Sequence, residues 1–481
     1  MKTKFLLICF FLAGFSLLAN AGDPQRIGHT TLTPRHNTVT NSDGTFMADD
    51  KGMYSAAIDP TNGYAYFIGT YLFKLDITGN LPVQVGPSIN TGQLIQNAID
   101  PAAGYLYLPK GTLNRYSLGA GTNAVAAAGS LALAAGSAGE ILIDDSDPNP
   151  ANHYGYVICT SSGNPVKVAK VALGTFTELG STNLLANETN FLFGSVADAQ
   201  KGYAYFVTQT ISNTSWIVKI KMTPGINPPG RIGAASLSVS NATIDGGCID
   251  TVHGYAYFDT YSSDTNIPAT VFKVKLGDGD VAPTVVGNVS LHAGEGRLAA
   301  GVVDPANGFV YFANDNTYPG GVYQLSLNGT NLPVEITYLP FQSGTSSTNP
   351  PNGITAQNTT TNSDGLLPFG EVFFRSAVFD PVRGFAYFGQ DSRPNQVVKM
   401  KVAVIDPFTL TGAKTQNGSF QSSFMNIAGA SFSVLTSTNL ALPLSNWIKL
   451  GSVTEISPGQ FQFSDSQAAN NPERFYRVSA P

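Results

Sequence analysis

The sequence predicts an all-β chain, built as a seven-bladed β-propeller with a small β module after it. The prediction rests on a turn-and-strand motif that returns along the chain, on the strand-like segments after each copy, and on the composition. Gly (50 residues) and Pro (29 residues) are plentiful, and charged residues make up only 12% of the 481 residues, about half the usual share. This composition is typical of many short strands joined by tight turns.

The repeated motif is an Asp, a turn that ends in Gly four residues later, and an aromatic strand. In IDPTNGYAYF (58–67), Asp59 can accept hydrogen bonds from the turn backbone, and Gly63 can take the positive φ that closes it. The next residues alternate large and small side chains, as the two faces of a strand require. Six regular copies and one stretched copy occur, at 56–67, 97–108, 195–206, 247–258, 301–312, 376–388 and, stretched, 142–159.

Two further strands are predicted after each copy. The third is mostly apolar, as in WIVKIKM (216–222), and the fourth often has Gly followed by Leu four residues later, as in RIGAASL (231–237). Four strands in a unit of about 40–50 residues are typical of propeller blades, which bury their faces against neighbouring blades. A tandem array of β-sandwiches is the alternative.

The turns and aromatic strands between residues 55 and 402 resemble the YVTN/NHL-like group of seven-bladed propeller repeats. The resemblance implies a propeller that binds a protein, a sugar or another ligand on one face, and a minority of such proteins are enzymes. It therefore specifies the fold and leaves the ligand open.

The ring is predicted to close through the N-terminus. The last repeat supplies three strands, ending at 396–402, and the segment after it lacks the Gly-then-Leu pattern, which appears instead in RIGHTTL (26–32). We therefore expect residues 26–33 to pair with 396–402 as the outermost strand of the last blade, because closing so long a loop costs little more than closing a short one. The alternative is that residues 403–410 fill this place.

The remaining segments are predicted to be an export signal and a separate module. Residues 1–21 carry two lysines, an apolar run and a small-residue cleavage site, as secretory signals do. A membrane anchor is less favoured, because the apolar run is too short to span a bilayer. We expect a propeller over 22–412 and a β module over 418–481. Through NWIKLGSVTEISPGQFQFSD (446–465) and NNPERFYRV (470–478), the module resembles modules that end large secreted bacterial proteins. The export signal predicts that the protein is located in the periplasm, at the cell surface or outside the cell.

The charge pattern excludes some partners, and the cysteines are predicted to stay unpaired. The net charge is −6 and no basic cluster occurs, so a nucleic acid is not expected as a partner. No membrane span is expected after the signal. Cys159 and Cys248 fall in repeats that are not neighbours, too far apart for a disulfide.

No catalytic residue, metal or cofactor is predicted. The five histidines are scattered and show no spacing typical of a metal site or of a His–carboxylate pair. In DDSDPNPAN (144–152), three side chains have the spacing of a calcium loop, but Pro150 stands where that loop needs Gly, so a hydrogen-bonded turn is favoured. The NSDG segments at 41–44 and 362–365 are likewise interpreted as Asx turns rather than cation sites.

The candidate ligand site is one mouth of the predicted channel. The charged or aromatic residues near the starts of the inner strands there are Tyr54, Glu140, Asp245 and Arg375.

Two long links, 34–54 and 341–375, precede ring neighbours and would bring Asp43 and Asp364 to a rim beside this mouth. We therefore expect a binding protein for an unknown protein or carbohydrate. The alternative is a propeller enzyme, a lyase or hydrolase, with its site at the same mouth.

Overall fold

A computed structural model of the chain gives the fold, which has two compact units. The first covers Pro24–Pro305 and Phe309–Val402, and the second includes Ala403–Pro481. The signal segment, Asp43, Asp364, both NSDG segments and residues 403–410 lie outside the residues that the structure describes. The described residues are 24–32, 52–92, 96–162, 164–189, 191, 194–264, 266–315, 320–341, 371, 373–391, 395–402, 411–416, 419–426, 432–440, 442, 446–457, 460–470 and 473–479.

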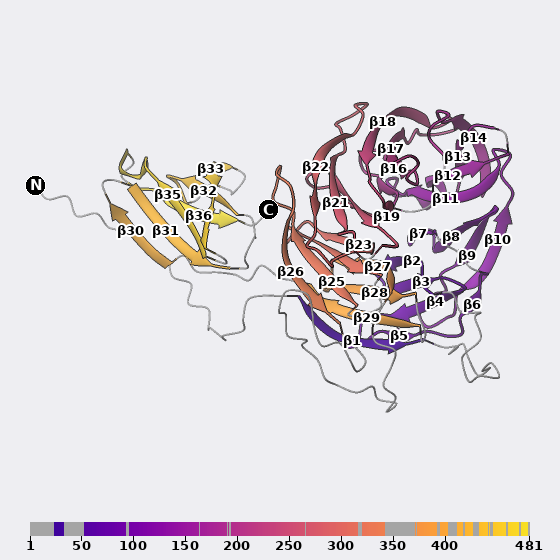
Figure 1. The fold of residues 1–481 in the computed structure, drawn as a ribbon, viewed down its shortest axis with the longest axis horizontal. Coiled ribbons are helices and arrows are strands. Elements are labelled where there is room, and N and C mark those ends of the chain that lie inside the picture. Colours follow the sequence, from indigo (N-terminus) through magenta and orange to yellow (C-terminus); the bar gives the residue numbers. More distant parts are fainter. Residues whose placement is uncertain are drawn as a thin grey trace, which may run out of the picture. The chain divides into compact units, whose positions relative to one another are not determined.

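Seven antiparallel sheets make up the described part of the first unit (Figure 1). We number them by the order of their first strands. Sheets 1 and 2 contain β2 (Ser55–Asp59), β3 (Tyr64–Ile68), β4 (Tyr71–Asp76), β5 (Val83–Gln84) and β6 (Ile89–Asn90), then β7 (Ala98–Asp100), β8 (Tyr105–Lys110), β9 (Thr112–Ser117) and β10 (Ala126–Leu131). Sheets 3 and 4 contain β11 (Ser137–Asp144), β12 (Tyr154–Thr160), β13 (Lys167–Ala172) and β14 (Thr177–Asn183), then β15 (Val196–Asp198), β16 (Tyr203–Val207), β17 (Thr214–Lys221) and β18 (Gly230–Ser238). Sheets 5 and 6 contain β19 (Thr243–Asp250), β20 (Tyr255–Tyr261), β21 (Thr270–Lys275) and β22 (Thr284–Ser290), then β23 (Leu298–Asp304), β24 (Phe309–Asn314), β25 (Gly321–Ser326) and β26 (Val334–Pro340). Sheet 7 contains β27 (Phe374–Asp380), β28 (Phe385–Gln390), β29 (Gln396–Lys401) and β1 (Gln25–Thr31).

The first strand of each sheet contacts the first strand of the next, and β27 of sheet 7 contacts β2 of sheet 1. The apolar core lies between neighbouring sheets. Between sheets 4 and 5, for example, Ile217 and Leu237 belong to one buried cluster with Phe258 and Val274. Each sheet therefore depends on its neighbours to bury its faces, as stacked repeats do.

The Asp–Gly turn joins the first two strands as the sequence predicts. Glycines at the end of the six regular turns have φ between 71° and 77°, where a Cβ would be unfavourable. Oδ1 of Asp59 accepts a hydrogen bond from the backbone N–H of Asn62 (3.1 Å), and Asp250 caps the turn of its own repeat in the same way (3.0 Å). The aspartates thus cap turns.

The N-terminal strand β1 pairs antiparallel with β29, near the other end of the first unit. The ladder runs from Gln25 opposite Lys401 to Thr31 opposite Gln396. Leu32, directly after β1, is fully buried among residues of sheets 1 and 7. The pairing expected from RIGHTTL is therefore present.

A buried cation in the third strand ties most sheets to the next one. Lys219 is fully buried, and its Nζ donates to the carbonyl oxygens of Leu276, Gly277, Gly279 and Val281 in the β21–β22 turn of sheet 5 (2.7–3.1 Å). It also lies 4.0 Å from the ring centroid of Tyr203, a favourable cation–π distance. The cations at this position are Lys74, Arg115, Lys170, Lys219, Lys273 and Lys399.

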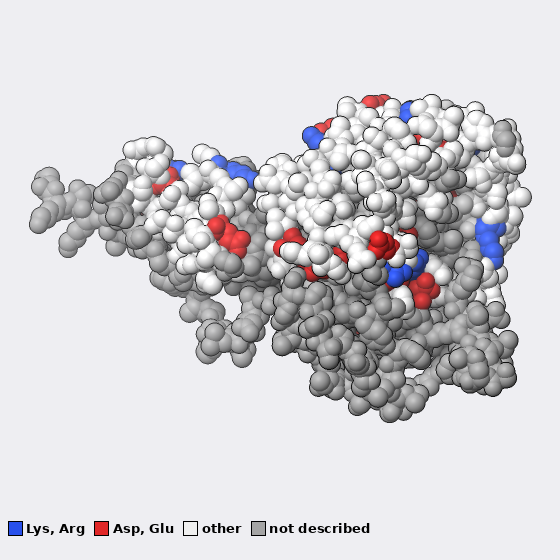
Figure 2. Space-filling model, in the orientation of Figure 1, with Lys and Arg blue, Asp and Glu red and all other residues white. Residues whose placement is uncertain are grey.

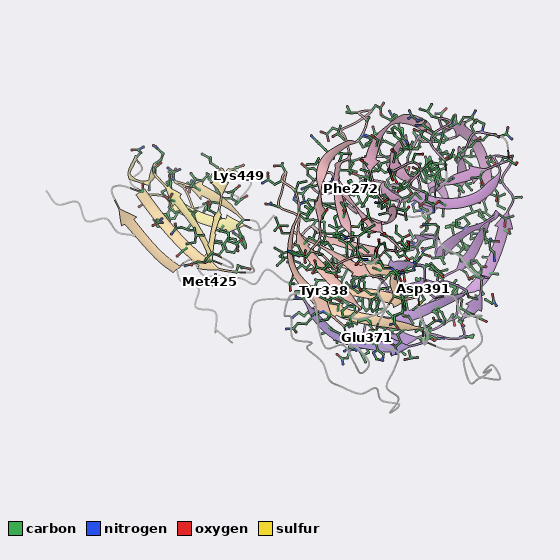
Figure 3. All side chains as sticks on the ribbon, in the orientation of Figure 1. Phe272, Tyr338, Glu371, Asp391, Met425 and Lys449 are labelled. Carbon is green, nitrogen blue, oxygen red and sulfur yellow. The ribbon has the colours of Figure 1, made fainter. Side chains whose placement is uncertain are left out.

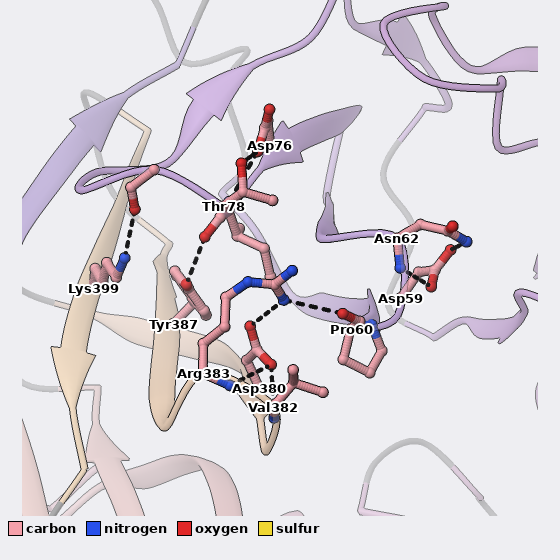
Figure 4. A network of polar contacts seen from close by, with 12 residues as sticks. Asp59, Pro60, Asn62, Asp76, Thr78, Asp380, Val382, Arg383, Tyr387 and Lys399 are labelled. Atoms are coloured by element: carbon pink, nitrogen blue, oxygen red, sulfur yellow. Dashed lines mark hydrogen bonds and ion pairs between the residues drawn. The ribbon is translucent and has the colours of Figure 1, made fainter.

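The contact between sheet 7 and sheet 1 uses the same device (Figure 4). Lys399 Nζ donates to the Gly79 carbonyl (2.8 Å), and the Tyr387 hydroxyl donates to the Ile77 carbonyl (3.3 Å). Arg383 Nη1 bridges Asp380 of its own turn (2.9 Å) and the Pro60 carbonyl of sheet 1 (3.0 Å).

The second unit is a small all-β module of two sheets. One has the order β30 (Thr411–Gln416), β31 (Ser419–Met425), β35 (Gln460–Asp465), β34 (Thr454–Ser457), and the other β33 (Ile448–Ser452), β32 (Ser433–Ser437), β36 (Phe475–Ser479). Its core includes Phe420 stacked on Tyr476, with ring centroids 4.4 Å apart. Because β30 pairs with β31, this unit has a strand before residue 418, where the sequence prediction starts the module.

Among the residues that the structure describes, helical structure is limited to single turns such as η1 (Pro150–Asn152) and η4 (Ala468–Asn470). Within the described ranges, no helix has the length and apolar character needed to cross a bilayer.

Candidate functional site

A cavity of about 190 Å³ opens where the first strands begin. Its wall is largely polar and backbone-rich, because small residues occupy the crowded strand starts. A Cβ on Gly247 would lie 2.1 Å from the Gly194 carbonyl oxygen of the neighbouring sheet. The lining residues are Tyr54, Ser55, Ala56, Gln96, Asn97, Gly194, Ser195, Asp245, Gly246, Gly247, Ala299, Ala300, Gly301, Arg375, Ser376 and Ala377.

Arg375, at the start of β27, contributes a positive charge to the cavity wall and forms ion pairs with two aspartates. Its Nη2 donates to Asp315 Oδ2 (2.7 Å), and its Nε lies 3.2 Å from Asp391 Oδ2. Both acids follow the second strands of sheets 6 and 7, and Asp391 is labelled in Figure 3. Burial raises the pKa of Asp315 and of Asp391, and the Arg375 guanidinium partly opposes both shifts.

Aromatic rings surround the guanidinium of Arg375. Its Cζ lies 5.7 Å from the Tyr54 ring centroid and 5.2 Å from that of Tyr261. The Tyr54 hydroxyl also bonds to Asp391, and burial together with that carboxylate raises the pKa of Tyr54 to about 12. The Tyr54 hydroxyl is therefore protonated at neutral pH and acts as a hydrogen-bond donor, as it does toward Asp391.

Arg297 adds a second cation from the link before β23. Its Nη2 donates to the Tyr261 hydroxyl (2.5 Å) and lies 3.8 Å from Asp315 Oδ2. Its φ of 60° is in the left-handed region, which non-glycine residues adopt at some cost and which is common at functional sites.

Asp245, in β19, faces the same cavity as a weak acid. Burial raises its pKa to about 7, while Arg375 lowers it and Asp315 and Asp391 raise it. Behind it, Asp259 in β20 is fully buried, and burial followed by the Asp245 charge raises the pKa of Asp259 well above its ordinary value. This side of the cavity can hold protons at neutral pH.

Glu140 lies apart from this group. It is buried in β11, where its hydrogen-bond partner is Ser195 from the next sheet, and it does not line the cavity. Burial raises its pKa to about 7, and the bonds to Ser195 oppose the shift. Glu140 can therefore act on the cavity only by positioning Ser195, which does line it.

The structure thus brings together Tyr54, Asp245 and Arg375 from the predicted site. Sequence reasoning missed Asp315, Asp391, Arg297 and Tyr261, which reach the mouth from the ends of second strands or from a link. The segments FAND (312–315) and FGQD (388–391) carried a weak signal, since each places an Asp directly after an aromatic strand.

The sequence shows no spacing typical of a His–carboxylate pair, yet the structure places four histidines beside carboxylates, the first being His29, whose Nδ1 lies 2.7 Å from Glu371 Oε1. His153 Nδ1 lies 2.7 Å from Asp100 Oδ2, with both side chains buried, and His253 Nδ1 lies 2.7 Å from Asp250 Oδ2. His292 lies near two glutamates, Glu295 and Glu335. Of these partners, only Asp250 and Glu295, each three residues from its histidine, could have been noticed in the sequence, as in HAGE (292–295).

The DDSDPNPAN segment forms a hydrogen-bonded turn. Asp144 Oδ1 accepts from the Ser146 hydroxyl (2.6 Å), Asp147 Oδ1 from the Asn149 amide (2.8 Å), and Asn149 Oδ1 from the Ala151 amide (3.1 Å). Two of these three bonds come from the backbone of the turn and the first from the Ser146 side chain within it, as that interpretation expects.

Cys159 and Cys248 are buried thiols in different apolar clusters. Charged side chains are sparse on the face drawn in Figure 2, and neither sign forms a continuous patch over its described part.

No known protein family matches this sequence, and no curated protein does. Solved structures match the fold. The structure of U3-55K has a TM-score of 0.50 at 8% identity, covering 78% of this chain and 99% of its own. The RRP9 WD40 repeats have a TM-score of 0.51 at 8% identity, covering 79% and 99%. The chain therefore has a β-propeller fold like that of WD40 repeats, and identity this low says nothing about the ligand.

Proposed function

We propose that the chain is a secreted or cell-surface binding protein that holds a protein or carbohydrate ligand at the mouth of its central cavity. Its scaffold would be a seven-bladed propeller of the YVTN/NHL-like kind, closed by residues 26–33. The seven sheets, the cyclic contacts of their first strands and the β1–β29 ladder support this scaffold. An exported protein would lose residues 1–21, and N-terminal sequencing of the protein from the extracellular fraction would find Gly22 first.

The observation that carries the binding function is the gathering of Tyr54, Tyr261, Arg297 and Arg375 beside the cavity. Tyr and Arg are the residues that most often dominate binding energy, because a rigid ring or a planar guanidinium gives both contact area and directed hydrogen bonds. Each guanidinium is held by rings or acids, so little side-chain entropy is lost on binding. Such a mouth suits a ligand with hydroxyl, amide or carboxylate groups.

The test is binding of the purified mature chain to arrays of oligosaccharides and of extracellular proteins. Each ligand found is then measured with Arg375→Ala and with Lys221→Ala as the matched control. Lys221, at the end of β17 in sheet 4, lies outside the cavity and makes an exposed ion pair with Asp280. We expect Arg375→Ala to weaken binding about tenfold or more and Lys221→Ala to leave it unchanged. Equal affinities for all three proteins would place the ligand elsewhere.

A propeller enzyme, lyase or hydrolase, is the second candidate, and Asp245 favours it. A carboxyl with a pKa of about 7 in a cavity wall beside Arg375 has the properties of a general acid or base at neutral pH. Turnover of any ligand found above should then disappear in Asp245→Asn while its binding remains. A ligand that is bound and not converted by the wild type argues against an enzyme for that ligand.

A further inference from the structure

Three links between sheets carry a buried glutamate, and in two of them an arginine neutralises it. Glu188, before sheet 4, accepts from Arg231 Nε of β18 (2.9 Å), and Glu371, before sheet 7, accepts from Arg26 Nε of β1 (2.6 Å). Both glutamates are 1% exposed, and Glu371 is labelled in Figure 3. Each arginine comes from the fourth strand of the sheet that follows the link.

The two arginines hold the same place in the strand ladder. Arg231 lies opposite Ile220, and Arg26 opposite Met400, in each case one residue past the buried lysine of the third strand. In sheet 6 the same place, opposite Leu325, is occupied by Glu335. The buried glutamate of the link before that sheet is Glu295, which is 2% exposed.

Sheet 6 therefore sets two carboxylates where sheets 4 and 7 have a carboxylate and a guanidinium. His292 is the third member of the group. Its Nδ1 lies 3.1 Å from Glu295 Oε2 and 3.0 Å from Glu335 Oε2, and its backbone N–H donates to Glu295 Oε2 (2.8 Å). The three ligand atoms lie within 4.8 Å of one another.

Protons alone serve this arrangement poorly. A single Nδ1–H shared between two carboxylate oxygens makes only two weak, bent hydrogen bonds, and without a cation the group becomes neutral only by binding two protons, for example on the imidazole and one glutamate. A divalent cation with two carboxylates and a neutral imidazole is neutral, as the Glu–Arg pairs of sheets 4 and 7 are. The two His292–glutamate separations, 3.1 and 3.0 Å, are close to this geometry, because ligand atoms about 2.0–2.1 Å from a tetrahedral ion lie roughly 3.3 Å apart.

We propose that His292, Glu295 and Glu335 bind a divalent transition-metal ion of the Zn²⁺ type. The mixed nitrogen and oxygen ligands favour such an ion over Ca²⁺ or Mg²⁺, which prefer oxygen alone. The ion replaces the arginine of the other sheets and fastens the link before β23 to β26. His292 is 66% exposed, so water or a ligand atom from a partner can complete the coordination.

The experiment is a calorimetric titration of the EDTA-treated mature chain with Zn²⁺. We expect saturable binding by the wild type and an affinity at least about tenfold lower for His292→Ala. Glu335→Arg rebuilds the Glu–Arg pair of sheets 4 and 7, so it should lose the site and keep a melting temperature that no longer responds to Zn²⁺ or EDTA. His253→Ala is the control, since His253 has one acid beside it, Asp250, and should bind as the wild type does.

Absence of saturable binding by the wild type would overturn the proposal. The proposal would also be overturned if His292→Ala and Glu335→Arg bound Zn²⁺ with the affinity of the wild type, because the Zn²⁺ would then lie elsewhere. Should Glu335→Arg fail to fold, Glu335→Gln takes its place, with at least a tenfold loss of affinity expected and an unchanged affinity overturning the site.

Discussion

At the scale of single residues, the chain satisfies its buried lysines with backbone carbonyls and the buried glutamates Glu188 and Glu371 with arginines. The turn aspartates and glycines could be predicted, because their effect is local and their spacing is fixed. The buried lysines were visible as a repeated Lys in segments such as VKIK (218–221) and FKVK (272–275). Their carbonyl partners lie some 50 residues away, so only the fold reveals why an ammonium is there.

Lys219 should be more important for stability than an ordinary lysine. In Lys219→Met the four carbonyl oxygens around Nζ lose their donor, and we expect the free energy of unfolding to fall by roughly 2–4 kcal/mol. Lys221→Met, two residues along the same strand, removes only an exposed ion pair and should change little. Urea denaturation of both variants compares them, and similar losses would mean that the carbonyl cage contributes nothing.

Asp245 should make stability depend on pH. Because its pKa is raised to about 7, the folded state binds more protons than the unfolded state, and this contribution is lost as pH rises from about 4 through 7. The Asp245→Asn variant lacks this pH-dependent contribution, because an amide does not titrate. We therefore expect the variant to gain about 1–2 kcal/mol relative to wild type between pH 5 and 8, less than the full shift because the side chain is partly exposed. Denaturation curves at several pH values give the difference, and a constant difference contradicts the assignment.

At the scale of elements, the Gly-then-Leu pattern predicts the fourth strand because it marks a bulge. Gly28, Gly129, Gly180, Gly233 and Gly287 lie opposite the cation of the third strand, next to a shift in register. Sheet 6 differs from this pattern at both positions. Thr337 stands where these fourth strands have Gly, and Gln324 stands opposite it where the other third strands have a cation. Its neighbour, sheet 7, takes its outer strand from the N-terminus, so the chain has no ordinary turn there for a lysine to hold.

Gly233 is needed because the turn of the next sheet approaches it. A Cβ there would lie 2.7 Å from Ala282 Cβ, so Gly233→Ala should cost about 1–3 kcal/mol. Gly180 has the same place in sheet 3, and a Cβ there meets its nearest atom, Pro228 Cβ, at 3.8 Å. Gly180→Ala should therefore be tolerated.

The two glycine variants are compared by thermal unfolding, together with Gly233→Ala/Ala282→Gly, which should recover most of the loss. Equal melting temperatures for the two single variants would show that close approach is not the reason for glycine.

At the scale of the whole molecule, repeats could be predicted far better than the site. The pattern of turns and strands predicted the sheets, and RIGHTTL predicted the partner of β29, because both depend on residues close in sequence. The mouth of the cavity joins residues such as Tyr54 and Asp391, which come from opposite ends of the first unit. Such pairs have no local signal, and for this reason the sequence predicted Tyr54, Asp245 and Arg375 only as strand starts.

Closure through the N-terminus predicts that a chain starting at residue 38 is much less stable than one starting at residue 22. It loses the β1–β29 ladder, the burial of Leu32 and the Arg26 partner of buried Glu371. Together these exceed roughly 5 kcal/mol, so the melting temperature should fall by about 10 °C or more. The open edge of β29 should also promote aggregation.

Two comparisons make this test specific. Removing residues 411–481 deletes strands of the other unit and should leave the first unit's melting transition in place. Adding a peptide of residues 22–37 to the shortened chain should raise its midpoint again, because β1 lies at the edge of its sheet and can pair from solution. If residues 403–410 supplied the outer strand instead, the shortened chain would melt with the full one and the peptide would have no place to bind.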